Sequence, residues 1–214
     1  MSMKLEGFLK ITRDLPVIEI ELLLAGISNP DPLKVQISRW EKAGKLIQLK
    51  RGIYLLADAY RKIEVYEPYI ASILKRPSYL SLEKALEYYG LIPEAVKVYT
   101  SVTTKRAGVF SSPAGVFGYK HIKSSLFWGY KPLTLRRQTA FIAAPEKALL
   151  DLIYLNGIKI TSDYLEGLRL QNLEQINLDT LFQYAGKFQK PGMLRAAKVI
   201  EKYVRSYNKG GKAL

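Results

Sequence analysis

Basic side chains recur at helical spacing in residues 31–44, and side chains of this type bind the phosphates and base edges of nucleic acids. Between Leu33 and Ile53 the sequence holds six basic residues and one acid, Glu41. On a helix that turns by about 100° per residue, one face carries Lys34, Val35, Ser38, Arg39 and Lys42. The spacing predicts a helix that packs with one face and presents the other to a polyanion.

These side chains have distinct expected roles at a DNA duplex. Arg39 can donate two hydrogen bonds to guanine in the major groove, and Val35 can contact the methyl group of thymine. The lysines are suited to phosphates, which set the register of a protein on DNA without reading its sequence. The candidate DNA-contacting residues are Lys34, Val35, Ser38, Arg39, Lys42, Lys45, Lys50 and Arg51. For any single lysine, a solvated charged face is the alternative interpretation.

The elements around this basic helix predict how it is positioned. Helices are expected at 4–11 and 16–25, the second with Ile18, Leu22 and Ala25 on one packed face. The basic helix itself has clear boundary signals. Asn29 can cap it, Pro30 suits its first position, Asp31 complements its dipole and Gly44 ends it; its expected core stripe is Leu33, Ile37 and Trp40.

A basic hairpin follows the third predicted helix. Two apolar-rich strands, Lys45–Leu49 and Gly52–Leu56, are joined by the turn Lys50-Arg51-Gly52. Three helices followed by a basic hairpin predict a winged helix-turn-helix over residues 1–60 that binds double-stranded DNA.

A larger mixed α/β domain is expected over residues 61–214, after a polar stretch at 58–62. The fold class is therefore α+β, or mixed α/β, with two domains. Apolar spacing and turn signals predict helices at 66–74, 81–90, 145–156, 177–186 and 192–207, and strands at 96–102, 115–122 and 139–143. The strand order does not follow from the sequence.

The last predicted helix carries a second basic stripe. The formal net charge is +14, and residues 187–214 hold eight basic side chains and one acid. The stripe consists of Arg195, Lys198, Lys202 and Arg205. It predicts either a site for an acidic protein face or a nucleic-acid backbone, or an ordinary packed helix with a solvated face. A membrane surface is less favoured because the apolar face is rich in small residues.

Composition excludes several classes of site. The chain has no cysteine and one histidine, which excludes disulfides, thiolate metal sites and cysteine nucleophiles and makes a zinc centre improbable. We expect no metal and no cofactor. The N-terminus lacks the apolar run of a signal peptide, and the run Leu22–Ala25 is too short to cross a bilayer. A cytoplasmic protein with no membrane partner is expected.

Several motifs, taken in order, resemble those of one protein family. They are Lys50-Arg51-Gly52-Ile53-Tyr54, Ser78-Tyr79-Leu80-Ser81-Leu82-Glu83-Lys84-Ala85-Leu86, Tyr89-Gly90-Leu91-Ile92-Pro93-Glu94, Thr100-Ser101-Val102-Thr103-Thr104, and Ala144-Pro145-Glu146-Lys147-Ala148-Leu149-Leu150-Asp151. Together they resemble the AbiEi-type antitoxins of type IV toxin-antitoxin systems, over about residues 15–155. The last third of the chain is less distinctive.

The resemblance implies a transcriptional regulator of a phage-defence locus. Its N-terminal winged helix would repress its own operon by binding operator repeats, and its C-terminal domain would counteract a nucleotidyltransferase-like toxin. Direct contact with that toxin is not implied, and the pattern carries no catalytic residues onto this chain. We therefore do not expect an enzyme.

Three other function classes stay open. A metal-dependent nuclease would need clustered carboxylates with a lysine nearby, for which Glu83, Glu146, Asp151 and Lys147 are the available residues. A non-specific nucleic-acid-binding protein would need only the charge. An RNA-binding module could stack bases on Tyr119, Phe127, Trp128 and Tyr130, although such aromatic side chains more often belong to a core.

Overall fold

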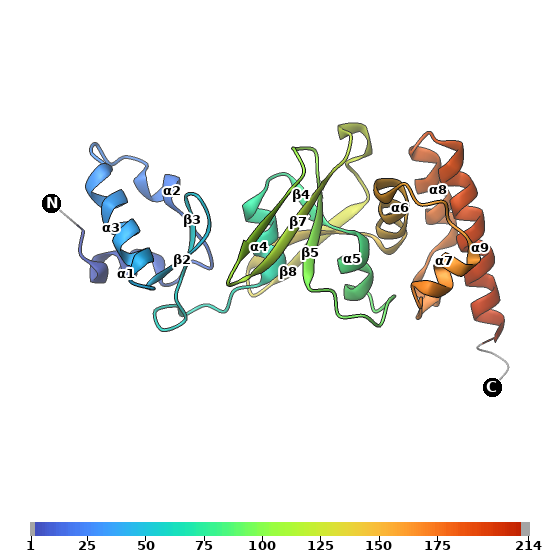
Figure 1. Cartoon of the computed structure of the whole chain (residues 1–214), viewed down its shortest axis with the longest axis horizontal. Coiled ribbons are helices and arrows are strands. Elements are labelled where there is room, and N and C mark those ends of the chain that lie inside the picture. Colours follow the sequence, from blue (N-terminus) through green and yellow to red (C-terminus); the bar gives the residue numbers. More distant parts are fainter. Residues whose placement is uncertain (1–2, 211–214) are drawn as a thin grey trace.

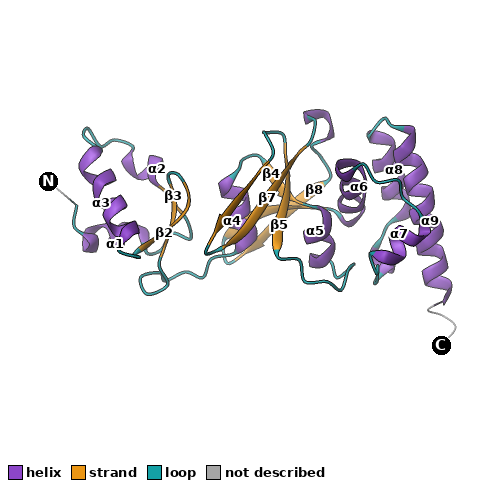
Figure 2. Ribbon diagram, viewed as in Figure 1, coloured by secondary structure: helices purple, strands orange, loops and turns teal. Residues whose placement is uncertain are grey.

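The computed structural model describes residues 3–210, which form an elongated molecule (Figure 1). An N-terminal unit lies at one end, a six-stranded sheet occupies the middle, and a group of helices forms the other end. Helices and sheets both contribute (Figure 2), which confirms the α+β class predicted from the sequence. Residues 1–2 and 211–214, the outermost parts of the two expected domains, lie outside the described residues.

Three helices and a small sheet build the N-terminal unit. Its elements are α1 (Leu5–Thr12), β1 (Ile18–Glu19), α2 (Ile20–Leu24), α3 (Asp31–Lys42), β2 (Leu46–Lys50) and β3 (Ile53–Leu56). The sheet is antiparallel, with strand order β1-β3-β2. The β2–β3 hairpin turns through Gly52, whose φ of 80° lies in the left-handed region that glycine adopts readily.

The helix expected over residues 16–25 is wrong in its first part. Ile18 and Glu19 pair with β3 as a short strand, and only Ile20–Leu24 is helical. Ile18 is buried, whereas the Leu22 side chain is 71% exposed and Ala25 is also exposed. The expected packed face therefore does not form, because the strand changes the direction of the chain before the helix begins.

The core stripe of α3 is confirmed. Leu33, Ile37 and Trp40 are all buried, and the Trp40 ring lies 4.8 Å from the Phe8 ring of α1 between centroids. The helix begins one residue later than expected, with Pro30 as its N-cap residue. The Asn29 side-chain oxygen accepts a hydrogen bond from the Asp31 amide at 3.3 Å. These contacts fix which face of α3 points outward.

A mixed sheet organises the rest of the chain. The helices are α4 (Glu67–Leu74), α5 (Leu82–Tyr88), α6 (Pro145–Asn156), α7 (Ser162–Gly167), α8 (Leu178–Lys187) and α9 (Pro191–Gly210), with 3-10 turns η1 (Ser124–Leu126) and η2 (Leu173–Gln175). Helices α4, α5 and α6 contact this sheet, and the later helices pack on α6 or on one another. The strands are β4 (Ser78–Leu80), β5 (Val98–Thr103), β6 (Gly108–Ser112), β7 (Gly115–His121), β8 (Tyr130–Leu135) and β9 (Gln138–Ala143).

The strand order is β6-β7-β5-β4-β9-β8. Strand β5 pairs parallel with β7 and β4 pairs parallel with β9, while the other neighbours are antiparallel. Helix α4 contacts β4, β5 and β9, and α6 contacts α5, α8 and α9. One large hydrophobic cluster runs through the sheet and these helices.

At the helical end of the molecule, α6, α8 and α9 follow the sequence closely, whereas α7 was not predicted. Helix α6 begins at Pro145 and ends before Gly157, whose φ is 63°, and Asn177 caps α8 by accepting from the Thr180 amide. The apolar face of α9 is buried as expected, through Ala196, Ala197, Ile200 and Val204. Among residues 3–210, no helix is long and apolar enough to cross a membrane.

Candidate nucleic-acid interface

The outward face of α3 carries the predicted contact residues together. Lys34, Val35, Ser38, Arg39 and Lys42 are all exposed. Lys34 Nζ lies 3.0 Å from Asp31 Oδ1, so its charge is partly neutralised within the same helix. Within the described part of the chain, Arg39 and Lys42 have no ion-pair partner. The face therefore presents two free cations beside the half-exposed side chain of Val35.

The basic side chains of the β2–β3 hairpin differ in their exposure to solvent and in their contacts. Arg51 is exposed at the turn, and Lys45 is half-buried at the start of the hairpin. The Lys50 ammonium instead donates to the carbonyl oxygen of Leu74, at 3.1 Å, and lies 5.4 Å from the centroid of the Phe110 ring. Lys50 thus joins the hairpin to the second unit, which differs from the predicted phosphate contact.

The small sheet has two covered faces. One face carries Leu46, Tyr54 and Leu56, which belong to the core under the three helices. The other side contributes Leu49 and Leu55 to the large cluster of the second unit. The Arg76 guanidinium strengthens this contact with two hydrogen bonds to Glu19, at 2.9 and 3.0 Å.

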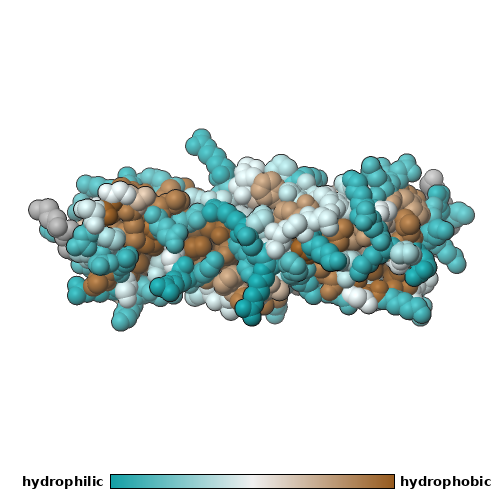
Figure 3. Space-filling view, turned by 90° about the horizontal axis from the view of Figure 1, so that it is seen from above, coloured by the Kyte–Doolittle hydropathy of each residue, from teal (hydrophilic) through white to brown (hydrophobic). Residues whose placement is uncertain are grey.

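This junction leaves α3 as the free side of the N-terminal unit, because the second unit occupies the opposite side (Figure 1). A view from above shows long hydrophilic side chains along the molecule, with hydrophobic residues exposed between them (Figure 3). Sequence reasoning missed the junction. The available signal was the unbroken apolar run Ile53–Leu56 of β3, since a strand that is covered on both faces carries apolar residues without alternation.

The second basic surface lies on α9, at the end of the molecule opposite α3 (Figure 1). Arg195, Lys198, Lys202 and Arg205 are all exposed there. Arg205 donates from Nε and Nη2 to Glu201 Oε1, at 3.0 and 2.8 Å, so part of this charge is paired. The two basic surfaces do not form one continuous groove.

A buried polar cluster lies inside the second unit, and the sequence did not predict it. Lys147 on α6 pairs with Asp151 one helical turn later, and both side chains are fully buried. Lys147 Nζ also donates to Tyr79 Oη at 2.9 Å. Asp151 Oδ2 accepts from Tyr79 Oη at 3.0 Å and from Ser81 Oγ at 2.8 Å.

Burial dominates the electrostatics of this cluster. It raises the pKa of the Asp151 carboxyl, although the Lys147 ammonium and the two hydroxyl donors act in the opposite direction. Burial likewise lowers the pKa of Lys147, against the effect of Asp151. The pKa of Tyr79 is raised first by burial and then by the Asp151 charge. Since neither charge reaches solvent, the cluster links β4 and α6 and is closed to a substrate.

The cluster changes the interpretation of two motifs. Ser81, the first residue of the helix predicted over 81–90, is the N-cap residue of α5 but makes no cap hydrogen bond, because its hydroxyl donates to Asp151. Glu146 accepts from the Asn177 amide at 2.8 Å and is not part of the ion pair. The available signal was the charged pair at i and i+4 within an otherwise apolar helix.

The candidate stacking aromatics mostly pack against other side chains. Tyr119 is buried, Trp128 contacts the ring of Phe188, and Tyr130 stacks on Tyr79 with centroids 4.8 Å apart. Phe127 lies 5.1 Å from the same tyrosine. Phe127, Tyr130 and Trp128 thus pack against Tyr79 or Lys147 of the buried cluster, whereas Tyr119 packs against Phe110.

Comparisons with known proteins do not assign the chain to a family. No protein-family model matches the sequence, and the search of curated proteins finds no match.

Proposed function

We propose that this chain is a DNA-binding transcriptional repressor whose residues 1–60 form a winged helix-turn-helix. The observation that carries the proposal is the outward face of α3, where Arg39 is exposed and has no ion-pair partner among residues 3–210. An α-helix of this kind fits the major groove of B-form DNA. Arg39 reads a guanine, and Val35 contacts a neighbouring thymine methyl group.

The remaining cations of the unit hold phosphates on either side of the helix. Lys34, Lys42 and Lys45 flank the base-reading positions, and Arg51 extends from the hairpin turn. Because phosphate contacts release counterions, affinity falls steeply with salt. Lys50 contributes chiefly to the junction between the units, since its ammonium is bound to Leu74.

A pair of variants tests this assignment. Arg39→Ala is expected to weaken binding to operator DNA by about 1–3 kcal/mol, the value of a good bidentate base contact. The matched control is Arg169→Ala, which removes the same charge from an exposed arginine of the second unit. Fluorescence anisotropy on the DNA upstream of the gene, against scrambled duplex, measures both. An equal loss on both duplexes for Arg39→Ala would remove base reading from the proposal.

The antitoxin role rests on the resemblance to AbiEi-type proteins. Two of the quoted motifs, 78–86 and 144–151, meet in the buried cluster through Tyr79, Lys147 and Asp151, so they support the same domain core. We propose that this domain counteracts a nucleotidyltransferase-like toxin in the cytoplasm, with or without contacting it. Co-expression with the neighbouring toxin gene should show that Arg39→Ala still protects cells although it no longer represses.

Point variants of the whole chain are a better test of this division than deletion of residues 1–60. Val17, Leu49 and Leu55 belong to the large core cluster, so the deletion would expose apolar surface on the second unit. A failure of the fragment would then reflect folding as much as function.

The geometry gives little support to a nuclease, because two of its candidate acidic residues already have partners. Asp151 is fully buried against Lys147, and Glu146 is occupied by the Asn177 amide. Within residues 3–210, no group of three or more histidines and acids could hold a metal ion. Non-specific binding of nucleic acid through α9 is the stronger alternative, since the four basic side chains of its stripe, Arg195, Lys198, Lys202 and Arg205, are exposed.

A further inference from the structure

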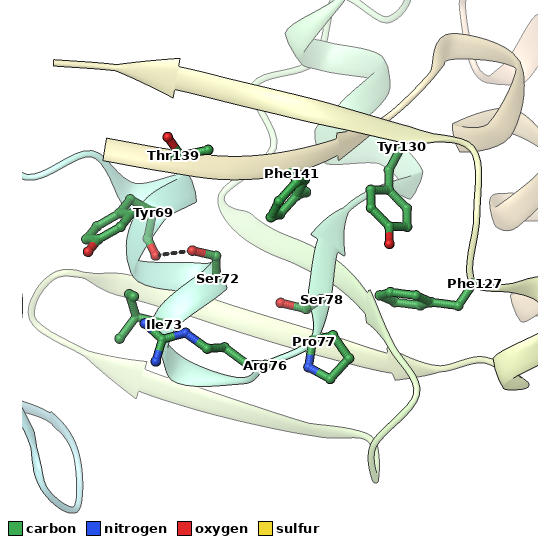
Figure 4. A pocket seen from close by; sticks show the side chains of 10 residues that line it. All are labelled: Tyr69, Ser72, Ile73, Arg76, Pro77, Ser78, Phe127, Tyr130, Thr139 and Phe141. Carbon is green, nitrogen blue, oxygen red and sulfur yellow. Dashed lines mark hydrogen bonds between the residues drawn. The ribbon is translucent and has the colours of Figure 1, made fainter. Parts of the chain in front are cut away.

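A pocket of about 410 Å³ opens beside the junction of the two units. It lies between α4, the start of β4, and strands β8 and β9, and Figure 4 shows its side chains. Four aromatic rings contribute to its wall: Tyr69, Phe127, Tyr130 and Phe141. Its size falls in the range of sites that enclose small molecules.

One buried hydroxyl in this pocket has no hydrogen-bond partner. Ser78 is only 7% exposed, and its Oγ is unpartnered among the described residues. Its hydroxyl points from β4 toward the middle of the lining side chains (Figure 4). A buried polar group without a partner destabilises the protein, because it has lost its hydrogen bonds to water. A ligand atom that bonds to Ser78 would offset this loss.

A cation lies at the edge of the same pocket. Arg76 lines it, and the guanidinium is shared with Glu19 of the N-terminal unit. The Arg76 side chain is 56% exposed, so a ligand can reach it from solvent. No acidic residue lines the pocket. The lining thus combines aromatic walls, several hydroxyl groups of which the buried Ser78 hydroxyl is unpartnered among the described residues, and one positive charge.

The wall of the pocket is held by the core behind it. Tyr130 and Phe127 pack on Tyr79, and Tyr79 is bound to Lys147 and Asp151. A wall supported in this way is preorganised, which lowers the entropic cost of binding.

We propose that this pocket binds a small aromatic anion. The ring lies among the four aromatic side chains, a polar substituent bonds to Ser78 Oγ, and a carboxylate or phosphate pairs with Arg76. Both anionic groups accept two parallel hydrogen bonds from a guanidinium. The anion competes with Glu19 for Arg76 and weakens the contact that joins β1 to the second unit.

This inference also deepens the proposed function, on which its regulatory part rests. If the N-terminal unit binds operator DNA, the ligand changes operator affinity by loosening the Arg76–Glu19 contact. Binding of the ligand itself does not depend on DNA, so calorimetry without DNA tests the pocket alone.

The experiment titrates full-length protein with phenyl phosphate and indole-3-acetate by isothermal titration calorimetry. Benzyl alcohol supplies a ring without the charge, and acetate and inorganic phosphate supply the charge without the ring. Binding of either ring-bearing anion, with at least tenfold weaker binding of the controls, is expected. Tighter binding of phenyl phosphate would indicate a phosphate ligand, and tighter binding of indole-3-acetate would indicate a carboxylate ligand. Absence of binding by both, or equal binding of the ring alone, would overturn the proposal.

Two matched pairs of variants locate the ligand. Ser78→Ala should weaken binding about five- to tenfold, the usual effect of one lost hydrogen bond. Ser101→Ala, which removes the other buried unpartnered serine hydroxyl outside the pocket, should leave binding unchanged. Equal effects of the two serine variants would contradict the assigned site.

The second pair breaks the same salt bridge from its two ends. Arg76→Gln should weaken binding about 10- to 100-fold, because it removes the charged donor. Glu19→Gln should strengthen binding, because it frees Arg76 from its competitor. A loss of binding in both variants would show that the bridge merely supports the fold, and would overturn the role of Arg76. Operator binding measured with and without ligand then tests the regulatory part separately.

Discussion

The exposed basic face of α3 and the buried Lys147 cluster of α6 differ in what surrounds the charge. On α3, Arg39 and Lys42 extend into solvent and lack ion-pair partners within the described residues. On α6, Lys147 is fully buried and bound by Asp151 and Tyr79. An exposed free cation costs the fold little and remains available to a polyanion, whereas a buried paired cation is committed to the core.

This difference predicts that the two sites respond oppositely to substitution. Variants of the α3 face should change DNA affinity and leave stability nearly constant. Variants of the buried cluster should change stability and affect DNA binding only by unfolding the protein. The following variants test the contrast, from the largest expected effect to the smallest.

Asp151→Asn should lower the free energy of unfolding by about 3–5 kcal/mol, because it leaves the buried Lys147 charge without its counter-ion. Denaturant unfolding followed by circular dichroism measures the change. The control is the double variant Lys147→Met/Asp151→Leu, which removes both charges and should recover most of the lost stability. If Asp151→Asn is as stable as the parent, the buried ion pair of α6 does not contribute the stability assigned to it.

Arg39→Ala should lower operator affinity by about 1–3 kcal/mol and leave the unfolding midpoint unchanged. Its side chain has no ion-pair partner to lose among residues 3–210. Anisotropy titration and thermal unfolding of the same sample measure both quantities. A large drop in stability would place Arg39 with the structural cations instead.

Arg51→Ala should weaken binding to operator and random DNA alike, and should reduce the slope of log affinity against log salt by about 1. Lys50→Met is the matched variant on the same hairpin. Because Lys50 is bound to Leu74 and lies over Phe110, its loss should mainly reduce stability. If Lys50→Met changed the salt slope as Arg51→Ala does, the hairpin would contact DNA as a whole.

Lys198→Ala on α9 should change stability by less than about 0.5 kcal/mol, as exposed substitutions generally do. Operator affinity should also stay the same, since α9 lies at the far end of the molecule from α3 (Figure 1). A loss of affinity as large as that of Lys42→Ala would bring the second basic surface into the DNA interface.

The sequence predicted the elements whose apolar spacing is long and well bounded. Helices α3, α6 and α9 were placed within one to three residues, because their packed faces repeat at helical spacing and proline, asparagine or glycine marks their ends. Strands β4, β6 and β8 were missed. They are short or exposed edge strands whose residues show no clear alternation in burial.

The residues of the candidate site that share one helix were predicted from the sequence. The contacts between residues far apart in the sequence were missed. Helical spacing alone placed Arg39 and Val35 on one exposed face. The contact of Lys50 with Leu74, the bridge from Glu19 to Arg76 and the pairing of Ser81 with Asp151 join residues 24 to 70 positions apart. Such partners depend on sheet order, which one sequence does not specify.

The central claim is that α3 reads DNA sequence, and one measurement tests it most directly. Fluorescence anisotropy compares the parent chain, Arg39→Ala and Arg169→Ala on the upstream DNA and on scrambled duplex, at several salt concentrations. The account predicts that the parent and Arg169→Ala prefer the upstream DNA and that Arg39→Ala loses this preference while remaining folded. Equal, steeply salt-dependent binding of all three proteins to both duplexes would contradict it and would indicate non-specific binding by charge.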